Sequence, residues 1–277
     1  MRCGRGLLEQ IMNRGCAVIA GASATVCRLR QTVAKIEGQE SDLGIGARSL
    51  AFGVRSIDAV LQGGLAPASL HEIAPAALRD LGVAVGFAFA LAARINDDGR
   101  NTLWIQTDFA AIESGNIYGL GCDLFGLSAR QLLILKVARP RDALWAMEEA
   151  LKCRALASVI AELPNDGPIA DLTATRRLTL AARAGGSFGF LFRHRPSPLT
   201  SSAETRWEVA VAPSRPDQFG GLGRTAFALS LTKNRHGPTG RWPVAWDHHE
   251  RVFSALSLGV AEAAFDRPDR TPLVHVG

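Results

Sequence analysis

The stretch SLHEIAPAALRDLGVAV (residues 69–85) decides how the rest of the sequence is interpreted. Its first part is a short apolar run typical of a buried strand, and from Val83 onward the apolar spacing is that of a helix. A tight turn from a buried strand into a helix is a common setting for phosphate binding, because the helix start presents unpaired backbone N–H groups. The turn at residues 74–82 is therefore the first place to search for phosphate-binding side chains.

That turn lacks the groups that phosphate binding requires. A phosphate loop needs glycines that let backbone N–H groups turn inward, a lysine for the β and γ phosphates, and a Ser or Thr hydroxyl for Mg²⁺. Residues 74–82 read APAALRDLG, and no lysine occurs between Lys35 and Lys136. The only basic residue, Arg79, is followed by Asp80, whose carboxylate repels phosphate. We therefore expect a degenerate phosphate loop, no ATP cofactor and no hydrolysis.

Apolar segments alternate with helical patterns around this stretch, which predicts an α/β fold with a mostly parallel sheet covered on both faces. The predicted strands are residues 69–74, 101–107, 132–138, 155–163 and 186–193, and the predicted helices lie near residues 83–95, 141–152 and 172–184. From Trp207 onward the pattern changes to strand after strand, at residues 206–213, 224–233 and 240–248. This change indicates antiparallel strands at one edge of the sheet.

Composition narrows the class of protein. The chain has 277 residues, of which 47% are hydrophobic and 21% are charged, which suits one globular domain with extensions. The sequence has no uninterrupted apolar run of about 18 residues, so we expect no membrane span. Its five cysteines are an odd number without CxxC spacing, which favours a reduced, cytoplasmic protein. We expect no metal site, because the adjacent His248 and His249 would point to opposite faces of a strand.

Positive charge is concentrated in the second half of the sequence. The net charge is +5, and an excess of that size falls between residues 164 and 251, so an anionic partner would meet this half. The polar loop at residues 194–205 is bracketed by basic side chains. Candidates for contact with a DNA backbone are Arg176, Arg177, Arg193, His194, Arg195 and Arg206. The alternative is a solvated loop or a protein-docking surface, because the loop offers no aromatic residue for base stacking.

Several segments, in chain order, resemble the RecA-like core. FGVRSIDAVLQGGLAPASLHEI (residues 52–73) resembles the segment that leads into its phosphate loop. LWIQTD resembles the strand that ends at the water-activating carboxylate, which would be Asp108. ASVIAEL resembles the magnesium-binding strand and has Glu162 in place of the usual aspartate, while FGFLFRH places His194 at the sensor position. The alternative for Asp108 and Glu162 is that they are solvated strand ends without a catalytic role.

LTKNRHGPTGRWPVAWD (residues 231–247) is similar to a C-terminal signature of RadA and DnaB-type ATPases. In those proteins a lysine and an arginine reach the γ-phosphate held by a neighbouring subunit. The resemblance implies this role for Lys233 and Arg235, which would contact an anion or a partner's nucleotide. The alternative is a well-formed turn between two strands.

A RecA-like core without a phosphate loop, with TRRLTLAARAGG (residues 175–186) before the sensor strand, resembles the ImuA family, which is related to RecA and to the division inhibitor SulA. The resemblance implies a cytoplasmic, non-catalytic accessory factor in SOS-induced translesion DNA synthesis. The implied partners are an ImuB-type, Y-family-like polymerase and RecA, with an error-prone DnaE-type polymerase engaged indirectly. DNA is left as an open partner. The open alternatives are an ATPase with a non-standard phosphate loop that uses Arg79, and a SulA-like inhibitor of cell division.

The resemblance also divides the chain. We interpret residues 1–22 as an extension whose true start codon the sequence does not fix, and residues 23–44 as a helix with a linker. The apolar side of that helix, formed by Val26, Leu29, Val33 and Ile36, is a predicted partner-binding element. The RecA-like core is predicted at residues 45–250 and a C-terminal tail at residues 251–277.

Overall fold

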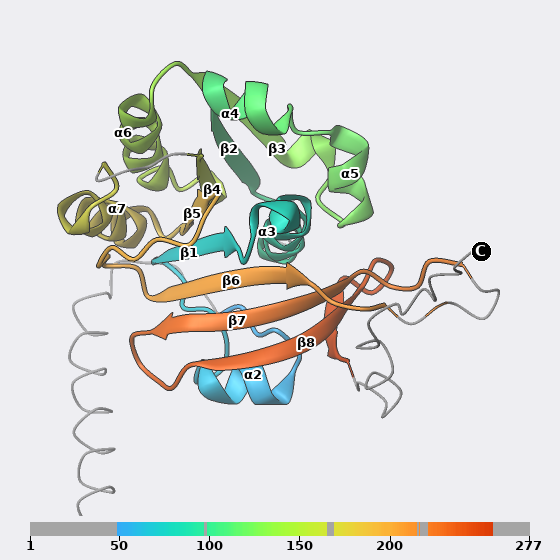
Figure 1. Ribbon diagram of the computed structural model, residues 1–277. Coiled ribbons are helices and arrows are strands. Elements are labelled where there is room, and N and C mark those ends of the chain that lie inside the picture. Colours follow the sequence, from blue (N-terminus) through green and yellow to red (C-terminus); the bar gives the residue numbers. More distant parts are fainter. Residues whose placement is uncertain (1–48, 97–98, 165–168, 215, 217–220, 257–277) are drawn as a thin grey trace, which may run out of the picture. The chain divides into compact units, whose positions relative to one another are not determined.

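The sheet of this protein has nine strands in the order β3-β2-β4-β5-β1-β6-β7-β8-β9 within the described part of the chain (Figure 1). The computed structural model describes residues 49–96, 99–164, 169–214, 216 and 221–256. The predicted partner-binding residues Val26, Leu29, Val33 and Ile36 lie outside these ranges. The strands are β1 (Leu70–Pro75), β2 (Asn101–Thr107), β3 (Leu132–Val137), β4 (Leu156–Leu163), β5 (Phe188–Arg193), β6 (Thr205–Val211), β7 (Ala226–Asn234), β8 (Gly240–Asp247) and β9 (Val252–Ala255).

The strands run in the directions predicted from the sequence, parallel in the first part and antiparallel in the last part. The strands from β3 through β6 are parallel to their neighbours, whereas β6, β7, β8 and β9 pair antiparallel in succession. The mixed sheet predicted from the change of pattern after Trp207 is therefore confirmed. The sheet nevertheless continues beyond residue 250, because Val252–Ala255 pairs with β8, so the predicted start of the tail needs correction.

Helices cover both faces of the parallel part (Figure 1). The helices of the described ranges are α2 (Arg55–Val60), η1 (Leu78–Asp80), α3 (Leu81–Ile95), α4 (Asp108–Ser114), α5 (Gly119–Leu124), η3 (Ala129–Gln131), α6 (Pro140–Leu151) and α7 (Leu172–Gly185), of which α2 lies beside the antiparallel strands (Figure 1). Helix α3 packs on one face, and α6 and α7 pack together on the other. A Cβ on Gly185 would lie only 1.9 Å from the Leu151 carbonyl oxygen. Glycine therefore lets the end of α7 approach the end of α6.

The two faces of the sheet have different cores. The α3 face is aromatic, with Phe52, Phe87 and Trp207 in mutual ring contact and a Phe52–Trp207 centroid distance of 5.3 Å. The α6–α7 face is lined by smaller side chains such as Ala146 and Ala182. Bulky rings fill the space under the single helix α3, while small residues let two helices lie close to the sheet. These rigid cores fix the strand ends at which the candidate site residues lie.

Strand β3 departs from the prediction that the parallel strands are covered on both faces. Within the described residues it is one of the two edge strands and pairs only with β2, and its Leu133, Ile134 and Leu135 side chains are exposed. A continuous apolar run is equally compatible with a central strand and with an uncovered edge strand. The sequence pattern alone therefore did not locate this edge.

Central strand β1 contains a buried histidine that sequence analysis did not single out. Because the Ala66 carbonyl can only accept, His71 Nε2–H donates to it at 3.0 Å. His71 Nδ1 then accepts from the Thr205 hydroxyl at 2.8 Å. Burial lowers the pKa of His71 from 6.5 to about 4, although the hydrogen bond to Ala66 opposes this shift. The ring is neutral at physiological pH and links β1 to the start of β6.

Candidate functional site

The turn after β1 is the place where a nucleotide-binding protein would hold phosphate. In this protein, backbone N–H groups of the turn donate hydrogen bonds to carbonyls of the same chain. Ala76 N–H donates to the Val209 carbonyl of β6 at 2.8 Å, and Asp80 N–H donates to the Ala77 carbonyl at 2.9 Å. The short helix η1 closes the turn before α3 begins. These two amides therefore do not point into an anion-binding loop. The side chain of Arg79 is exposed to solvent.

A carboxylate of the protein lies at the start of α3. Asp80 is the N-cap residue of this helix and is only 3% exposed. Its Oδ1 accepts a hydrogen bond from Val211 N–H at 3.2 Å, which ties the turn to the end of β6. The N-terminus of a helix attracts negative charge, and here the protein itself supplies that charge. A phosphate at this position would meet a fixed anion.

Glu162 is the centre of a buried hydrogen-bond network at the end of β4. Its Oε2 accepts from Trp104 Nε1–H at 2.9 Å and from the Gln106 amide at 3.0 Å. Its Oε1 accepts from His194 Nε2–H at 2.8 Å and lies 3.2 Å from the Ser114 hydroxyl, whose single proton is directed to the nearer Ala110 carbonyl at 2.7 Å. An ionised carboxylate has about four lone-pair sites, and three side-chain donors occupy most of them. Glu162 of β4 thus joins β2 to the residue that follows β5.

The two carboxylates predicted at strand ends have opposite environments. Asp108 is exposed and begins α4, whose first turn is capped by Thr107 Oγ1 accepting from Ala110 N–H at 3.1 Å. Glu162 is only 2% exposed, so the expectation of a solvated strand end holds for Asp108 and is wrong for Glu162. A single glutamate within a largely apolar strand could have indicated this burial. A carboxylate in such a strand is buried only where hydrogen-bond donors or positive charges surround it.

A second buried carboxylate, Glu72 of β1, binds two of the arginines predicted to contact DNA. Arg193 Nη2 donates to Glu72 Oε1 at 3.0 Å, and Arg206 Nε donates to Glu72 Oε2. The Arg206 guanidinium also donates to the carbonyls of Ser197 and Leu199, at 2.8 and 2.7 Å. Burial lowers the pKa of Arg193, and the charge of Glu72 partly offsets this effect. Arg206 therefore fastens the 194–205 loop to the sheet.

The structure separates the six DNA-binding candidates into two groups. Arg193 and His194 are buried and bound to carboxylates. Arg206 of β6 donates its hydrogen bonds to the 194–205 loop and to Glu72. The expectation of one phosphate-contacting surface is therefore corrected for these three side chains. The exposed candidates are Arg176, Arg177 and Arg195, and Arg177 pairs with Glu148 at 2.6 Å.

The KNRHGPTG turn joins β7 to β8 and hydrogen-bonds to two other segments, the 194–205 loop and α2. Lys233 Nζ donates to the Ser201 carbonyl at 2.6 Å, and burial is the main cause that lowers the pKa of Lys233. Asn234 Nδ2 donates to the Val60 carbonyl of α2 at 3.1 Å. The Arg235 side chain is 51% exposed and lies 4.0 Å from Glu204. The turn is thus firmly held, with Arg235 more accessible than Lys233.

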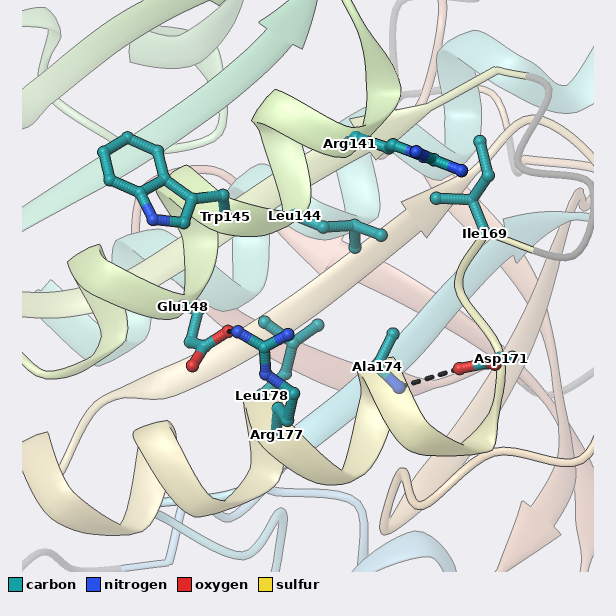
Figure 2. Close-up of a pocket in the computed structure, with 9 residues that line it drawn as sticks. All are labelled: Arg141, Leu144, Trp145, Glu148, Ile169, Asp171, Ala174, Arg177 and Leu178. Carbon is teal, nitrogen blue, oxygen red and sulfur yellow. Dashed lines mark hydrogen bonds and ion pairs between the residues drawn. The ribbon is translucent and has the colours of Figure 1, made fainter.

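A cavity of about 460 Å³ lies between α6 and α7 (Figure 2). Leu144 and Leu178 supply buried apolar surface, while Trp145, Arg141 and Arg177 are exposed beside it. The full lining is Arg141, Leu144, Trp145, Glu148, Ile169, Asp171, Ala174, Arg177 and Leu178. Sequence analysis named only Arg177 of this set, because the cavity depends on two helices that are separated in the chain.

The described ranges contain no group of three or more His, Cys, Asp or Glu side chains arranged to hold a metal ion. Within the same ranges, no helix is both long enough and apolar enough to cross a bilayer.

Comparison with known proteins supports both the fold and a family. No family model matches the sequence. Protein ImuA from two strains of Caulobacter vibrioides is 31% identical to this chain over 209 residues, which covers 70% of this chain and 81% of that protein. The crystal structure of the RadB recombinase is similar with a TM-score of 0.50 at 14% identity, covering 75% of this chain and 100% of RadB. The predicted RecA-like core is therefore confirmed, and the chain belongs to the ImuA family.

Proposed function

We propose that the protein is a RecA-like accessory factor without catalytic activity, which acts in damage-induced mutagenesis through contacts with other proteins. The observation that carries this proposal is the buried carboxylate of Asp80 at the start of α3. Backbone N–H groups at a helix start are the part of a RecA-like core that binds phosphate. A fixed negative charge there opposes a triphosphate, and the turn offers no lysine to compensate.

The state of Glu162 supports the same proposal. A carboxylate that binds magnesium or activates water must keep a lone pair free for that task. Both oxygens of Glu162 are already hydrogen-bonded within the protein, to Trp104, Gln106 and His194. Using Glu162 for catalysis would therefore require the loss of buried hydrogen bonds, each costing about 1 to 3 kcal/mol for the group left unsatisfied. Its structural role accounts for a glutamate at this position.

Membership of the ImuA family supports the biological setting that we propose. ImuA-type proteins accompany an ImuB-type polymerase in damage-induced translesion synthesis. We propose the same setting here, with the ImuB-type protein and RecA as direct partners and the DnaE-type polymerase reached through them. A core that has lost its own nucleotide chemistry can still present RecA-like surfaces to such partners.

Phosphate release by the purified full chain tests the proposal. We expect no release above background with Mg·ATP, either alone or with single-stranded DNA. In a strain that lacks the gene, Arg79→Ala and Asp108→Asn variants should restore damage-induced mutation as well as the wild-type protein does, because both exposed side chains would have no nucleotide to bind. Steady phosphate release that either substitution abolishes would refute the proposal. Restoration of cell-division arrest instead of mutation would favour the SulA-like alternative.

A further inference from the structure

Strand β3 is uncovered to a degree that no other parallel strand of the described sheet reaches. Residues 133–136 are exposed, and Leu133, Ile134 and Leu135 are 49%, 47% and 38% exposed. Successive side chains of a strand point to opposite faces, so apolar surface is exposed on both faces of the sheet at this edge. Within the described residues β3 pairs only with β2, which leaves the outward N–H and C=O groups of alternate residues without a strand partner.

The features that usually protect an edge strand are missing from β3. Edge strands are commonly kept apart by proline, by bulges, by short length or by several charged side chains. Residues 132–137 read LLILKV, pair with β2 without a register shift and carry one charge, on Lys136. Strand β9, at the other edge of the described sheet, has only four residues. β3 is therefore the edge that is suited to pair with another strand.

Exposed apolar side chains continue from β3 onto the preceding segment. Half of the large exposed hydrophobic residues of the described chain fall between residues 109 and 135, among them Ile112 and Tyr118. Lys136 Nζ donates to Asn116 Oδ1 at 2.7 Å, which places the segment after α4 against the end of β3. A large side chain that is half exposed presents on the order of 100 Å². The apolar surface of this region thus approaches the roughly 800 Å² per partner of a standard interface.

The sequence of β3 is complementary to itself. A two-fold axis perpendicular to the sheet makes the β3 strands of two copies antiparallel and keeps their corresponding faces on the same side. Only residues an even number of positions apart can then lie opposite each other, because neighbouring residues point to different faces. A pair centred on Ile134 sets this residue against its own equivalent, and sets Leu133 against Leu135 twice. The exposed apolar residues of each strand are then covered by those of the other.

The single charge of β3 favours the antiparallel arrangement. In the pair centred on Ile134, Lys136 lies opposite Leu132 of the second copy, so the two lysines are at opposite ends. A parallel pair in register would place the two ammonium groups side by side, and like charges that face each other across two strands are destabilising.

We propose that β3 pairs antiparallel with β3 of a second copy of this chain, about a two-fold axis at Ile134, so that the two sheets join into one. The long segments outside the described ranges do not begin at this edge. Residue 257 follows β9 at the opposite edge, and residue 48 precedes Leu50, which pairs with Leu65. The proposed dimer goes beyond the proposed function and does not depend on it.

Opposite charges at position 134 test this pairing, because each copy presents the residue to its own equivalent. Analytical ultracentrifugation of the full chain should show a wild-type dimer. We expect Ile134→Lys and Ile134→Glu each to weaken self-association at least about tenfold, because like charges replace buried apolar contacts. An equimolar mixture of the two variants should regain the dimer, since a lysine then faces a glutamate. The control Leu180→Lys changes an exposed leucine of α7, which packs on β1 and β5, and should dimerise like the wild type.

Hydrogen exchange locates the contact within the chain. Backbone amides of residues 132–137 should exchange more slowly in the wild-type dimer than in either charged variant. Amides of the buried strand β4 should exchange equally slowly in all three proteins, which shows that the variants are folded.

The inference is overturned by a wild-type chain that stays monomeric, by charged variants that dimerise as well as the wild type, or by a mixture that stays monomeric. A monomer whose β3 amides are protected would assign this edge to another segment of the same chain. Phosphate release does not require β3 pairing. ATP hydrolysis by a dimer would therefore refute the proposed function alone, whereas a monomer without hydrolysis would refute this inference alone.

Discussion

The end of the sheet around Asp80 and Glu162 and the groove between α6 and α7 use polar groups in opposite ways. At the sheet end, carboxylates are buried and every oxygen of Glu162 is bonded within the protein. At the groove, Arg141 and Trp145 are exposed and have no comparable partners in the described part of the chain. Polar groups that are bonded within the protein are occupied, whereas exposed side chains without a protein partner remain accessible to another molecule.

The largest stability effect should follow from Glu162→Ala. The substitution removes the acceptor of the buried Trp104 and His194 donors and one of the two acceptors of Gln106, and we expect the free energy of unfolding to fall by about 3 to 5 kcal/mol. Urea denaturation measures this change. The matched control is Glu149→Ala, an exposed glutamate of α6, with an expected loss below about 1 kcal/mol. Equal effects of the two substitutions would contradict the structural role of Glu162.

A pH-dependent effect should follow from His71. The unfolded chain binds a proton at this residue near pH 6.5, whereas the folded chain does so only near pH 4. The unfolded state therefore takes up more protons between these values, and stability falls as the pH is lowered through this window. The full loss is about 3 kcal/mol, from about 1.4 kcal/mol per pKa unit. Urea denaturation at several pH values should show a weaker dependence of stability on pH for His71→Gln than for the wild-type protein.

A smaller effect is expected at Gly237 in the KNRHGPTG turn. A Cβ there would lie 2.7 Å from both the Val60 carbonyl oxygen and Asn234 Nδ2. We expect Gly237→Ala to destabilise the protein by about 1 to 3 kcal/mol, because the turn and α2 must move apart. Gly82→Ala is the control, since its Cβ meets no atom within 4 Å in α3. That change should stabilise the helix by about 0.5 to 1 kcal/mol, so thermal denaturation should give opposite signs.

The smallest stability effect is expected for Trp145→Ala, at about 0.5 kcal/mol or less, because the ring is largely exposed. Trp246→Ala removes a fully buried ring and should cost about 3 to 5 kcal/mol. This pair of substitutions sharpens the contrast between the two regions, since an exposed ring should contribute little to the free energy of folding and a buried ring much more. A large loss of stability in Trp145→Ala would assign this ring to the core.

The sequence pattern was sufficient for the main elements of the fold. Residues 101–107 were predicted as a strand with the bounds that β2 has, and residues 172–184 match α7 to within one residue. These segments are long and strongly periodic, and their burial agrees with their local preference. The short helices α2, α4 and α5 were not predicted, because six or seven residues carry too little periodicity. Strand β9 was assigned to the tail for the same reason.

The candidate site could be predicted only in part. The defect in the turn after β1 follows from the missing lysine and glycines, which are visible in the sequence. The burial of Arg193 and Arg206 could not be predicted, because it depends on Glu72, which is distant in the chain and lies on a neighbouring strand. A charged residue is assumed to face solvent until a partner is found. The α6–α7 groove likewise arises only when the two helices pack together.

Calorimetric titration of the purified full chain with Mg·ATP tests the central claim most directly. The buried Asp80 carboxylate and the internal hydrogen bonds of Glu162 predict no saturable heat of binding up to millimolar nucleotide, and the same result for Asp108→Asn. Saturable binding with a micromolar Kd, lost in Arg79→Ala, would contradict the account and show that the turn after β1 holds a triphosphate.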